Sequence, residues 1–371
     1  MRQPCFLPFT QIGIIWYNLL VVGTIREFLM DLLKKKSLWL SIIVLLILCG
    51  ATVYVLHREL AGQDIWGTLL NADPFWFSMA VLAMVLYFIA DGMNIARPLR
   101  ISGHKISFGQ MLKYSFAGFF FSSITPSSTG GQPGQLYFMA KDGIKVHSGA
   151  FSLLCTLLSF QIISVSWGIV GAFFAPHGLW NLDGKYSYVF PIGFILNLAI
   201  IVTLACVLFS RKMACFFAWA YLKLPGKKSS KPGERYASLR SFAGYRRAAK
   251  VMRQNKAVFL KMLLNSFVQI TLYFSVPFLC ARALGADSLD WFSAVCTQGA
   301  LFLSVSSLPL PGAAGVTEYG YALFFDGLIP TGILGSALLL SRFCNFVLPL
   351  AESGIGMIVL QLKQKSLRTK R

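Results

Sequence analysis

The chain has 371 residues, of which 56% are hydrophobic and only 13% are charged. Soluble domains carry about 25% charged residues, so this composition excludes an ordinary soluble protein and indicates an all-α polytopic membrane protein. The basic residues behind the formal net charge of +20 lie in loops between apolar runs, which points to membrane sidedness and not to nucleic-acid binding.

The N-terminal residues 1–29 are open to two interpretations. Residues 4–25 are uncharged but contain prolines and amides, so they form a weak span. Met30 opens a normal start for an inner-membrane protein, and residues 1–29 are then an upstream extension of the reading frame. The alternative is a genuine extra helix. No small-residue cleavage site follows residues 4–25, which argues against a cleaved signal peptide.

Apolar stretches long enough to cross a membrane follow in chain order. A span needs about 20 apolar residues. Two further apolar regions, 106–140 and 290–328, are each broken near the middle by proline and glycine. The six uninterrupted candidates are residues 37–56, 75–96, 149–175, 188–210, 257–280 and 331–360.

The loop charges give every span a consistent orientation, because basic residues in short loops mark the cytoplasmic side. Region 106–140 is expected to enter and leave on the cytoplasmic face, and region 290–328 on the outer face. We therefore expect a multi-pass protein of the bacterial plasma membrane with a cytoplasmic C-terminus. The segments expected inside are the basic loop 211–256 and the basic tail 366–371, and those expected outside are loops 57–74, 176–187 and 281–289.

Two similar units follow one another inside a single transmembrane domain, residues 30–365. Each unit consists of a span, a broken hairpin and a second span, over about 75–175 and about 257–360, with an offset of about 184 residues. Since the two hairpins are expected to enter from opposite faces, the arrangement is an inverted-topology repeat with two broken or re-entrant helical hairpins.

The first break, FFFSSITPSSTGGQPGQLYFMAKDG, combines helix breakers with hydroxyls. Irregular backbone survives at membrane depth only inside protein or against a water-filled cavity. A helix that starts after such a break points free N–H groups and a partial positive charge into that cavity, which suits an anionic headgroup such as phosphate. The expected donors are Thr125, Ser127, Ser128, Thr129, Gly130, Gly131 and Gln132. The alternative is a break that only packs against its twin.

Three charged residues inside apolar regions need an explanation, because a charge within a membrane is usually paired or faces water. Glu318 follows Pro311, Gly312 and Gly315 of the second break, and Arg342 lies deep in the last span. Glu318 and Arg342 are expected to pair, either as a structural salt bridge or as a headgroup contact. Asp91 is expected near the cytoplasmic end of span 75–96.

At these residues the chain resembles the transmembrane region of the lysylphosphatidylglycerol synthase family. TPSSTGGQPGQLYFMAKDG resembles the first signature of that family, and LPLPGAAGVTEYGYALFF resembles the second. SALLLSRFCNF and ARPLRISGHKISFGQ resemble the arginine-bearing helices around them. The resemblance runs over about residues 37–365. It adds Arg97, Gln135, Tyr137 and Lys141 to the expected substrate-binding residues, although the family often has arginine where this chain has Gln135.

The resemblance implies a flippase-like domain without the soluble aminoacyl transferase of the best-known members. We expect a lipid flippase or transporter that moves an anionic or aminoacylated phospholipid, or a polyprenyl-linked lipid, between leaflets. The alternatives are a phosphatidylglycerol lysyltransferase, which makes lysyl lipid from lysyl-tRNA and confers resistance to cationic peptides, and an accessory protein of a polyprenol-linked glycosyltransferase. An enzyme is the less favoured reading, since no catalytic residue can be identified.

The expected partners are membrane lipids, with a separate lipid-modifying enzyme and a second copy of the chain as further candidates. Nucleic acid, cofactors and metals are not expected. The eight cysteines are scattered without a CxxC pair, and the four histidines sit in separate loops.

Overall fold

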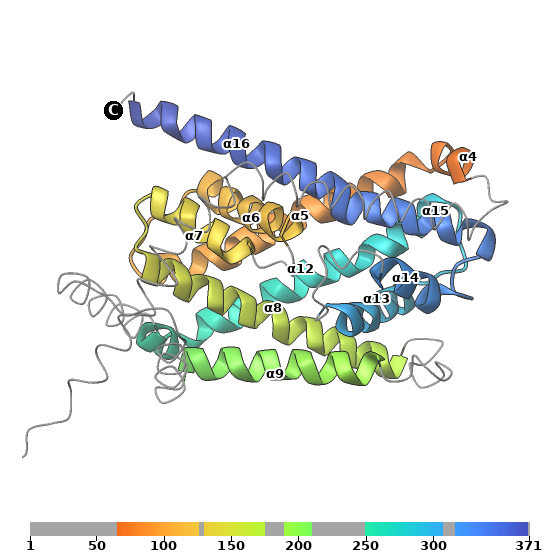
Figure 1. The fold of residues 1–371 in the computed structure, drawn as a ribbon, viewed down its shortest axis with the longest axis horizontal. Coiled ribbons are helices and arrows are strands. Elements are labelled where there is room, and N and C mark those ends of the chain that lie inside the picture. The colour runs from red at the N-terminus through yellow and green to blue at the C-terminus, as the bar shows by residue number, and fades with distance from the viewer. Residues whose placement is uncertain (1–64, 126–129, 175–188, 210–248, 307–315, 370–371) are drawn as a thin grey trace, which may run out of the picture.

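The computed structural model describes residues 65–125, 130–174, 189–209, 249–306 and 316–369, and within these ranges the chain is helical (Figure 1). The expected all-α polytopic class is confirmed. The helices are α4 (Ile65–Leu70), α5 (Pro74–Ile101), α6 (Phe108–Ser123), α7 (Gly131–Lys141), α8 (Val146–Phe174), α9 (Val189–Phe209), α12 (Lys256–Ala283), α13 (Trp291–Val305), α14 (Val316–Phe325), α15 (Thr331–Arg342), the π-helical turn η6 (Phe343–Val347) and α16 (Leu348–Thr369).

Five helical segments of the described chain are long and apolar enough to cross a membrane. They lie where the sequence predicts spans 75–96, 149–175, 188–210, 257–280 and 331–360, although α5 extends beyond its predicted end to Ile101. The predicted spans 4–25 and 37–56, most of loop 211–256 and the loop 176–187 lie outside the described residues.

Helices α5 and α12 form the central pair of the fold and run in opposite directions along each other (Figure 1). Small and medium side chains of both helices share one buried cluster, in which Ala80 and Met84 meet Cys280 and Val276. Polar side chains continue the contact toward the other end. The hydrogen bonds join Asn265 Nδ2 to the Ala90 carbonyl at 2.7 Å, Asn94 Nδ2 to Ser266 Oγ at 2.8 Å, Gln269 Nε2 to Asp91 Oδ1 at 3.3 Å, and Arg97 Nη1 to the Lys261 carbonyl at 3.3 Å.

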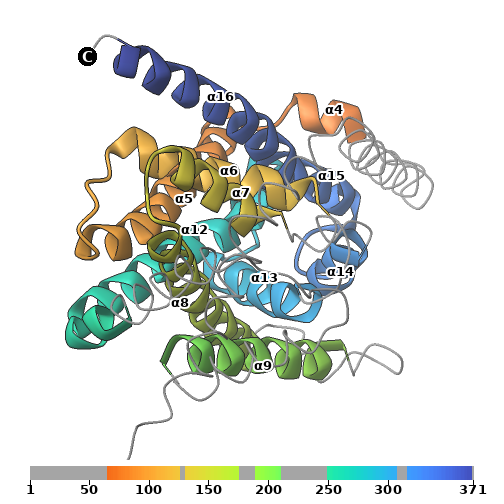
Figure 2. The same ribbon diagram turned by 60° about the vertical axis from the view of Figure 1, so that its left-hand side comes forward.

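Both broken regions consist of two helices that pack against each other, α6 with α7 and α13 with α14 (Figure 2). In both hairpins a glycine of one helix faces a long side chain of the other helix. The glycine belongs to the first helix in one hairpin and to the second helix in the other. A Cβ atom at Gly118 of α6 would collide with Gln135 of α7, whereas a Cβ atom at Gly320 of α14 would collide with Leu301 of α13. In each hairpin a glycine thus makes room for a long side chain of the other helix.

Helix ends repeat in the same way across the two units. Among the described residues, four glycines have a positive φ, a conformation that glycine adopts without a steric penalty at helix C-termini. Gly103 follows α5 and Gly285 follows α12, while Gly143 follows α7 and Gly327 follows α14. These equivalent positions, and the antiparallel pairing of α5 with α12, are what an inverted repeat requires. The inverted repeat itself, and the membrane face from which each hairpin enters, stay predictions.

The second helices of the repeats also start alike. Ser107 caps α6 by accepting from the Gln110 backbone, and Gln110 completes a capping box. Asp290 caps α13 by accepting from the Ser293 backbone at 3.0 Å. Hydrogen bonds from the Ser293 side chain and backbone lower the pKa of this exposed carboxyl.

A buried ion pair holds the first hairpin together. Lys113 Nζ of α6 lies 2.6 Å from Asp142 Oδ2 at the end of α7, and the two side chains are 0% and 2% exposed. Tyr114 donates a further hydrogen bond of 2.8 Å to the same oxygen. The Lys113 ammonium and the Tyr114 hydroxyl of α6 thus both bind the Asp142 carboxylate and hold the end of α7 against α6.

We predict that Lys113→Met destabilises the protein by about 3–5 kcal/mol, because it leaves the buried Asp142 carboxylate without its cation. Thermal unfolding in detergent measures the effect. The exposed Lys145→Met serves as the control and should leave the Tm unchanged. The double variant Lys113→Met with Asp142→Leu should recover much of the loss, and equal destabilisation by the single and double variants would contradict a stabilising ion pair.

We also predict that the ends of α7 and α14 face opposite sides of the membrane. Lys141 and Asp326 are exposed and lie at the ends of α7 and α14, so Lys141→Cys should react with a membrane-impermeant maleimide only from the cytoplasm and Asp326→Cys only from outside. The eight native cysteines must first be replaced. Gly131 is unsuitable as a labelling site, since a Cβ atom there would collide with Ser122 Oγ. Labelling of both positions from one side would rule out the inverted repeat.

Candidate functional site

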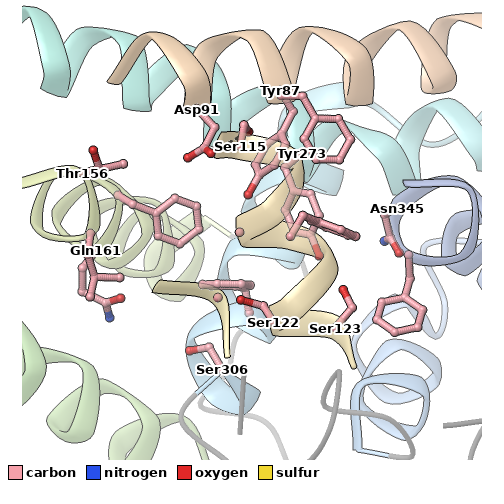
Figure 3. Close-up of a pocket in the computed structure, with 18 of the residues that line it drawn as sticks. Tyr87, Asp91, Ser115, Ser122, Ser123, Thr156, Gln161, Tyr273, Ser306 and Asn345 are labelled. Atoms are coloured by element: carbon pink, nitrogen blue, oxygen red, sulfur yellow. Dashed lines mark hydrogen bonds between the residues drawn. The ribbon is translucent and has the colours of Figure 1, made fainter. Parts of the chain in front are cut away.

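A cavity of about 450 Å³ lies between the two repeats, and both of them contribute to its lining (Figure 3). Its size falls within the range of small-molecule sites, and it suits a polar headgroup whose acyl or prenyl tails stay in the bilayer. The lining residues come from α5, α6, α7 and α8 of the first repeat, from α12, α13, α14, α15 and η6 of the second, and from α9.

The wall combines aromatic rings with polar groups, and apart from Asp91 and Arg342 these polar groups are uncharged. Phe88 and Phe119 meet edge to face at 5.3 Å between ring centroids, and Phe160 meets Phe302 in the same way at 6.1 Å. Between these rings the close-up shows hydroxyl and amide groups from several helices pointing inward (Figure 3). The labelled residues with an aliphatic hydroxyl or an amide are Ser115, Ser122, Ser123, Thr156, Gln161, Ser306 and Asn345, and Tyr87, Asp91 and Tyr273 are labelled beside them.

Several residues expected at the site do line this cavity. Gly131, Gln132 and Gln135 reach it from the first two turns of α7, and Arg342 reaches it from the last residue of α15. Thr125 and Gly130 shape the break beside it. Thr125 Oγ1 donates to the Phe121 carbonyl at 2.6 Å and accepts from the Gly130 N–H at 2.8 Å, so this hydroxyl closes the end of α6. The first break therefore brings the start of α7 to the cavity.

Other expected residues lie away from the cavity. Arg97 is occupied at the α5–α12 contact, where it donates to Asn94 Oδ1 at 2.9 Å. Lys141 is exposed and sits 5.8 Å above the ring of Tyr137. Their role in headgroup binding stays a prediction. The expected residues Ser128, Thr129, Pro311, Gly312 and Gly315 lie outside the described residues.

The predicted pairing of Glu318 with Arg342 is confirmed. Arg342 Nε and Nη2 each lie 2.5 Å from Glu318 Oε1, and the two side chains are 16% and 10% exposed. Glu318 sits in the first turn of α14, where the helix dipole favours a negative charge. The Arg342 guanidinium also lies 5.6 Å from the ring of Phe346. Arg342 thus faces the cavity with most of its charge already balanced.

The π-helical turn η6 explains how this side of the wall is built. A π turn inserts one extra residue into a helix and displaces the side chains around it. Here it follows Arg342 directly and carries Asn345, which is buried and lines the cavity together with Phe346. The sequence alone predicted one uninterrupted span over 331–360 and gave no indication of this turn.

Asp91 is the main site residue that the sequence analysis placed incorrectly. It was expected near the end of its span, but α5 continues to Ile101, so the carboxylate lies well inside the helix and lines the cavity. Ser115 Oγ donates to Asp91 Oδ2 at 2.6 Å, and Gln269 Nε2 donates to Oδ1 at 3.3 Å. A single carboxylate inside an otherwise apolar span was the signal that would have identified it.

Single amides within apolar spans form a second set that the sequence analysis did not select. Gln161 of α8 donates to the Asn197 carbonyl oxygen of α9, and Asn197 donates to the Leu303 carbonyl of α13 at 3.1 Å. Gln298 and Asn345 line the cavity with buried side-chain oxygens that have no hydrogen-bond partner in the described part of the chain. Unsatisfied acceptors of this kind favour a cavity that holds water or a donor-bearing ligand.

Two comparisons with known proteins agree with this architecture. The family model described as the lysylphosphatidylglycerol synthase TM region matches residues 38–352. A UPF0104 membrane protein from Archaeoglobus fulgidus is 24% identical over 302 residues, which covers 80% of this chain and 90% of the relative.

We predict that Glu318 and Arg342 are energetically coupled. Glu318→Ala and Arg342→Ala should each lower the Tm, since each leaves the other charge without its partner, while the double variant should be more stable than the sum of the single effects implies. The expected coupling is about 0.5–3 kcal/mol, measured by a double-mutant cycle of unfolding in detergent. Strictly additive effects would show that the contact contributes nothing to stability.

Proposed function

This chain belongs to the lysylphosphatidylglycerol synthase transmembrane-region family, and on that basis we propose that it is a lipid flippase or lipid transporter. The observation that carries the proposal is the polar cavity shared by two repeats whose twin helices run antiparallel. The proposed substrates are an anionic or aminoacylated phospholipid and a polyprenyl-linked lipid. The proposed setting is the bacterial plasma membrane, with the C-terminus in the cytoplasm.

The cavity supports transport because it offers a polar path in place of the hydrocarbon core. A headgroup that crosses unaided must give up its hydrogen bonds to water, at a cost of several kcal/mol for each group. Serine, glutamine and asparagine side chains replace part of that hydration, while the aromatic rings contact the less polar part of the headgroup. The lipid tails remain in the bilayer throughout.

The start of α7 is the proposed contact for a phosphate group. Gly131 and Gln132 lie in its first turn and line the cavity, and the N–H groups of a first helical turn have no partner within the helix. These donors and the helix dipole favour an anion. Arg342 lies across the same cavity and adds a positive group, although Glu318 competes for it.

In a transporter built from an inverted repeat, access alternates by rocking one repeat against the other around a fixed site. The long α5–α12 contact is the proposed fixed part, and the hairpins are the proposed moving parts. A separate enzyme that modifies the lipid, and a second copy of the chain, are proposed partners.

The two alternative functions are a lysyltransferase and an accessory protein of a glycosyltransferase, and the same transport experiments distinguish them from a flippase. A phosphatidylglycerol lysyltransferase would make lysyl lipid from lysyl-tRNA without any partner. An accessory protein of a polyprenol-linked glycosyltransferase would alter sugar transfer but would not move lipid in pure vesicles.

We predict that Gln298→Leu and Asn345→Leu slow lipid transport about tenfold without lowering stability. Each change removes a hydrogen bond to the headgroup worth about 1–2 kcal/mol, which corresponds to that factor in rate. Each also removes a buried acceptor that has no partner among the described residues, so the Tm should stay constant or rise. The exposed Gln254→Leu is the matched control.

Transport is measured in proteoliposomes with fluorescent phospholipids of different headgroups and a membrane-impermeant quencher. Flipping no faster than in protein-free vesicles, for anionic, zwitterionic and polyprenyl lipids alike, would rule out the transport proposal. Synthesis of lysyl lipid by the pure protein would support the transferase instead.

A further inference from the structure

Asp91 is a half-buried carboxylate of the cavity wall and has no cationic partner among the described residues. Asp142 pairs with Lys113 and Glu318 pairs with Arg342, but the ion pairs of the described residues do not include Asp91. Both printed contacts of its carboxylate are with neutral donors, Ser115 and Gln269. An ionised group inside a membrane protein is expensive unless an opposite charge compensates it, so this position is a candidate functional site.

A second observation at the same place points to a ligand. Gln269 is fully buried, and its Oε1 has no hydrogen-bond partner among the described residues. The Nε2 of the same amide donates to Asp91 at 3.3 Å, so covalent geometry keeps Oε1 close to the carboxylate. A buried acceptor beside a buried anion is unfavourable for both groups, and one positive charge between them would relieve both.

We propose that Asp91 and Gln269 Oε1 hold one monovalent cation, a sodium ion or a proton, and that its binding drives the transport of the lipid. A sodium ion would be shared by the carboxylate and the amide oxygen, which are the hard oxygen ligands that such ions prefer. A proton would turn the carboxylate into a carboxyl group that donates to the same amide oxygen. The driving role rests on the proposed function, whereas the cation site stands without it.

The surroundings of Asp91 favour a single charge. Tyr87 lies one turn away on α5, and α12 contributes Gln269 and Tyr273. From α6 comes Ser115, and the next charged group of that helix, Lys113, is bound to Asp142. The residues that α8 and η6 turn to the cavity are neutral, among them Thr156, Gln161 and Asn345, while Arg342 beside them is engaged by Glu318. One carboxylate among neutral oxygens suits a monovalent ion, because divalent sites gather more carboxylates.

The location of the site also suits coupling. Asp91 belongs to α5 and Gln269 to α12, the twin helices that pack antiparallel at the centre of the fold. A contact between twin helices lies next to the axis that relates the two repeats, and sites on that axis sit near the middle of the membrane. A cation site at this contact is therefore placed where a coupling ion is needed when access alternates.

The first test is binding, measured without lipid transport. In detergent, sodium chloride should raise the Tm of the protein by a few degrees relative to choline chloride of equal ionic strength, and Asp91→Asn should abolish the rise. If the cation is a proton, acidification should raise the Tm of the unchanged protein more than it raises the Tm of Asp91→Asn. Sodium should then have no effect on either protein. The exposed Asp326→Asn should behave like the unchanged protein in both experiments.

Gln269→Leu separates the two cations, since it removes the amide oxygen and keeps the carboxylate. It should abolish the sodium response but leave part of a proton response. Asp91→Asn loses no ion pair of the described chain, so it should fold, and its Tm in choline chloride verifies this. The proposed site would be overturned if the Tm of the unchanged protein and the Tm of Asp91→Asn responded equally to sodium and equally to acid.

The second test is coupling in proteoliposomes with a fluorescent phospholipid. An imposed sodium or proton gradient should raise the transport rate of the unchanged protein at least tenfold over its own rate without a gradient, whereas the rate of Asp91→Asn, whatever its value without a gradient, should not respond to the gradient. Equal rates in all conditions would overturn the driving role. A cation-dependent Tm together with no lipid movement would instead reject the proposed function and leave the site intact.

Discussion

The structure depends first on the contact between α5 and α12, which must hold together in a solvent that offers no hydrophobic driving force between helices. Alanine and cysteine let the two backbones approach at one end, and hydrogen bonds between amides, hydroxyls and carbonyls continue the contact at the other. Inside the membrane the donors and acceptors of these hydrogen bonds have no bulk water as an alternative partner. Because the two helices are equivalent members of the two repeats, this one contact also fixes the antiparallel relation between the halves, and the cavity forms where the halves meet.

A second constraint, the need to satisfy every backbone polar group, shapes the hairpins. A helix that stops inside the membrane exposes backbone N–H and C=O groups. At the end of α6 the Thr125 hydroxyl satisfies two of them, because it donates to the Phe121 carbonyl and accepts from the Gly130 N–H. The start of α7 is left to the cavity. The Lys113–Asp142 pair joins the start of α6 to the end of α7, at the end of the hairpin opposite to the break.

The sequence was sufficient for the helices and for part of the site. Long apolar runs have few alternatives in a membrane, and proline with glycine marks the breaks, so α5, α8, α9, α12 and both hairpins follow from pattern alone. Glu318 and Arg342 were predictable as a pair because each would be too costly alone. The positions of Asp91, Gln298 and Asn345 were not predictable in the same way. They depend on where α5 ends, on a π turn without a sequence signature, and on which face of each helix meets the other repeat.

The two units contribute different chemistry to the cavity. Asp91 lines it from α5 of the first unit and Arg342 from α15 of the second, so the acid and the base come from different units. A homodimer of a single repeat could not produce this arrangement, since it would present every acid and every base twice, each facing its own copy across the axis. Joining the two halves in one gene removes that restriction. In a single chain one unit can carry an acid and the other a base, and the proposed transport between two sides that differ in ion content and lipid composition would use such a difference.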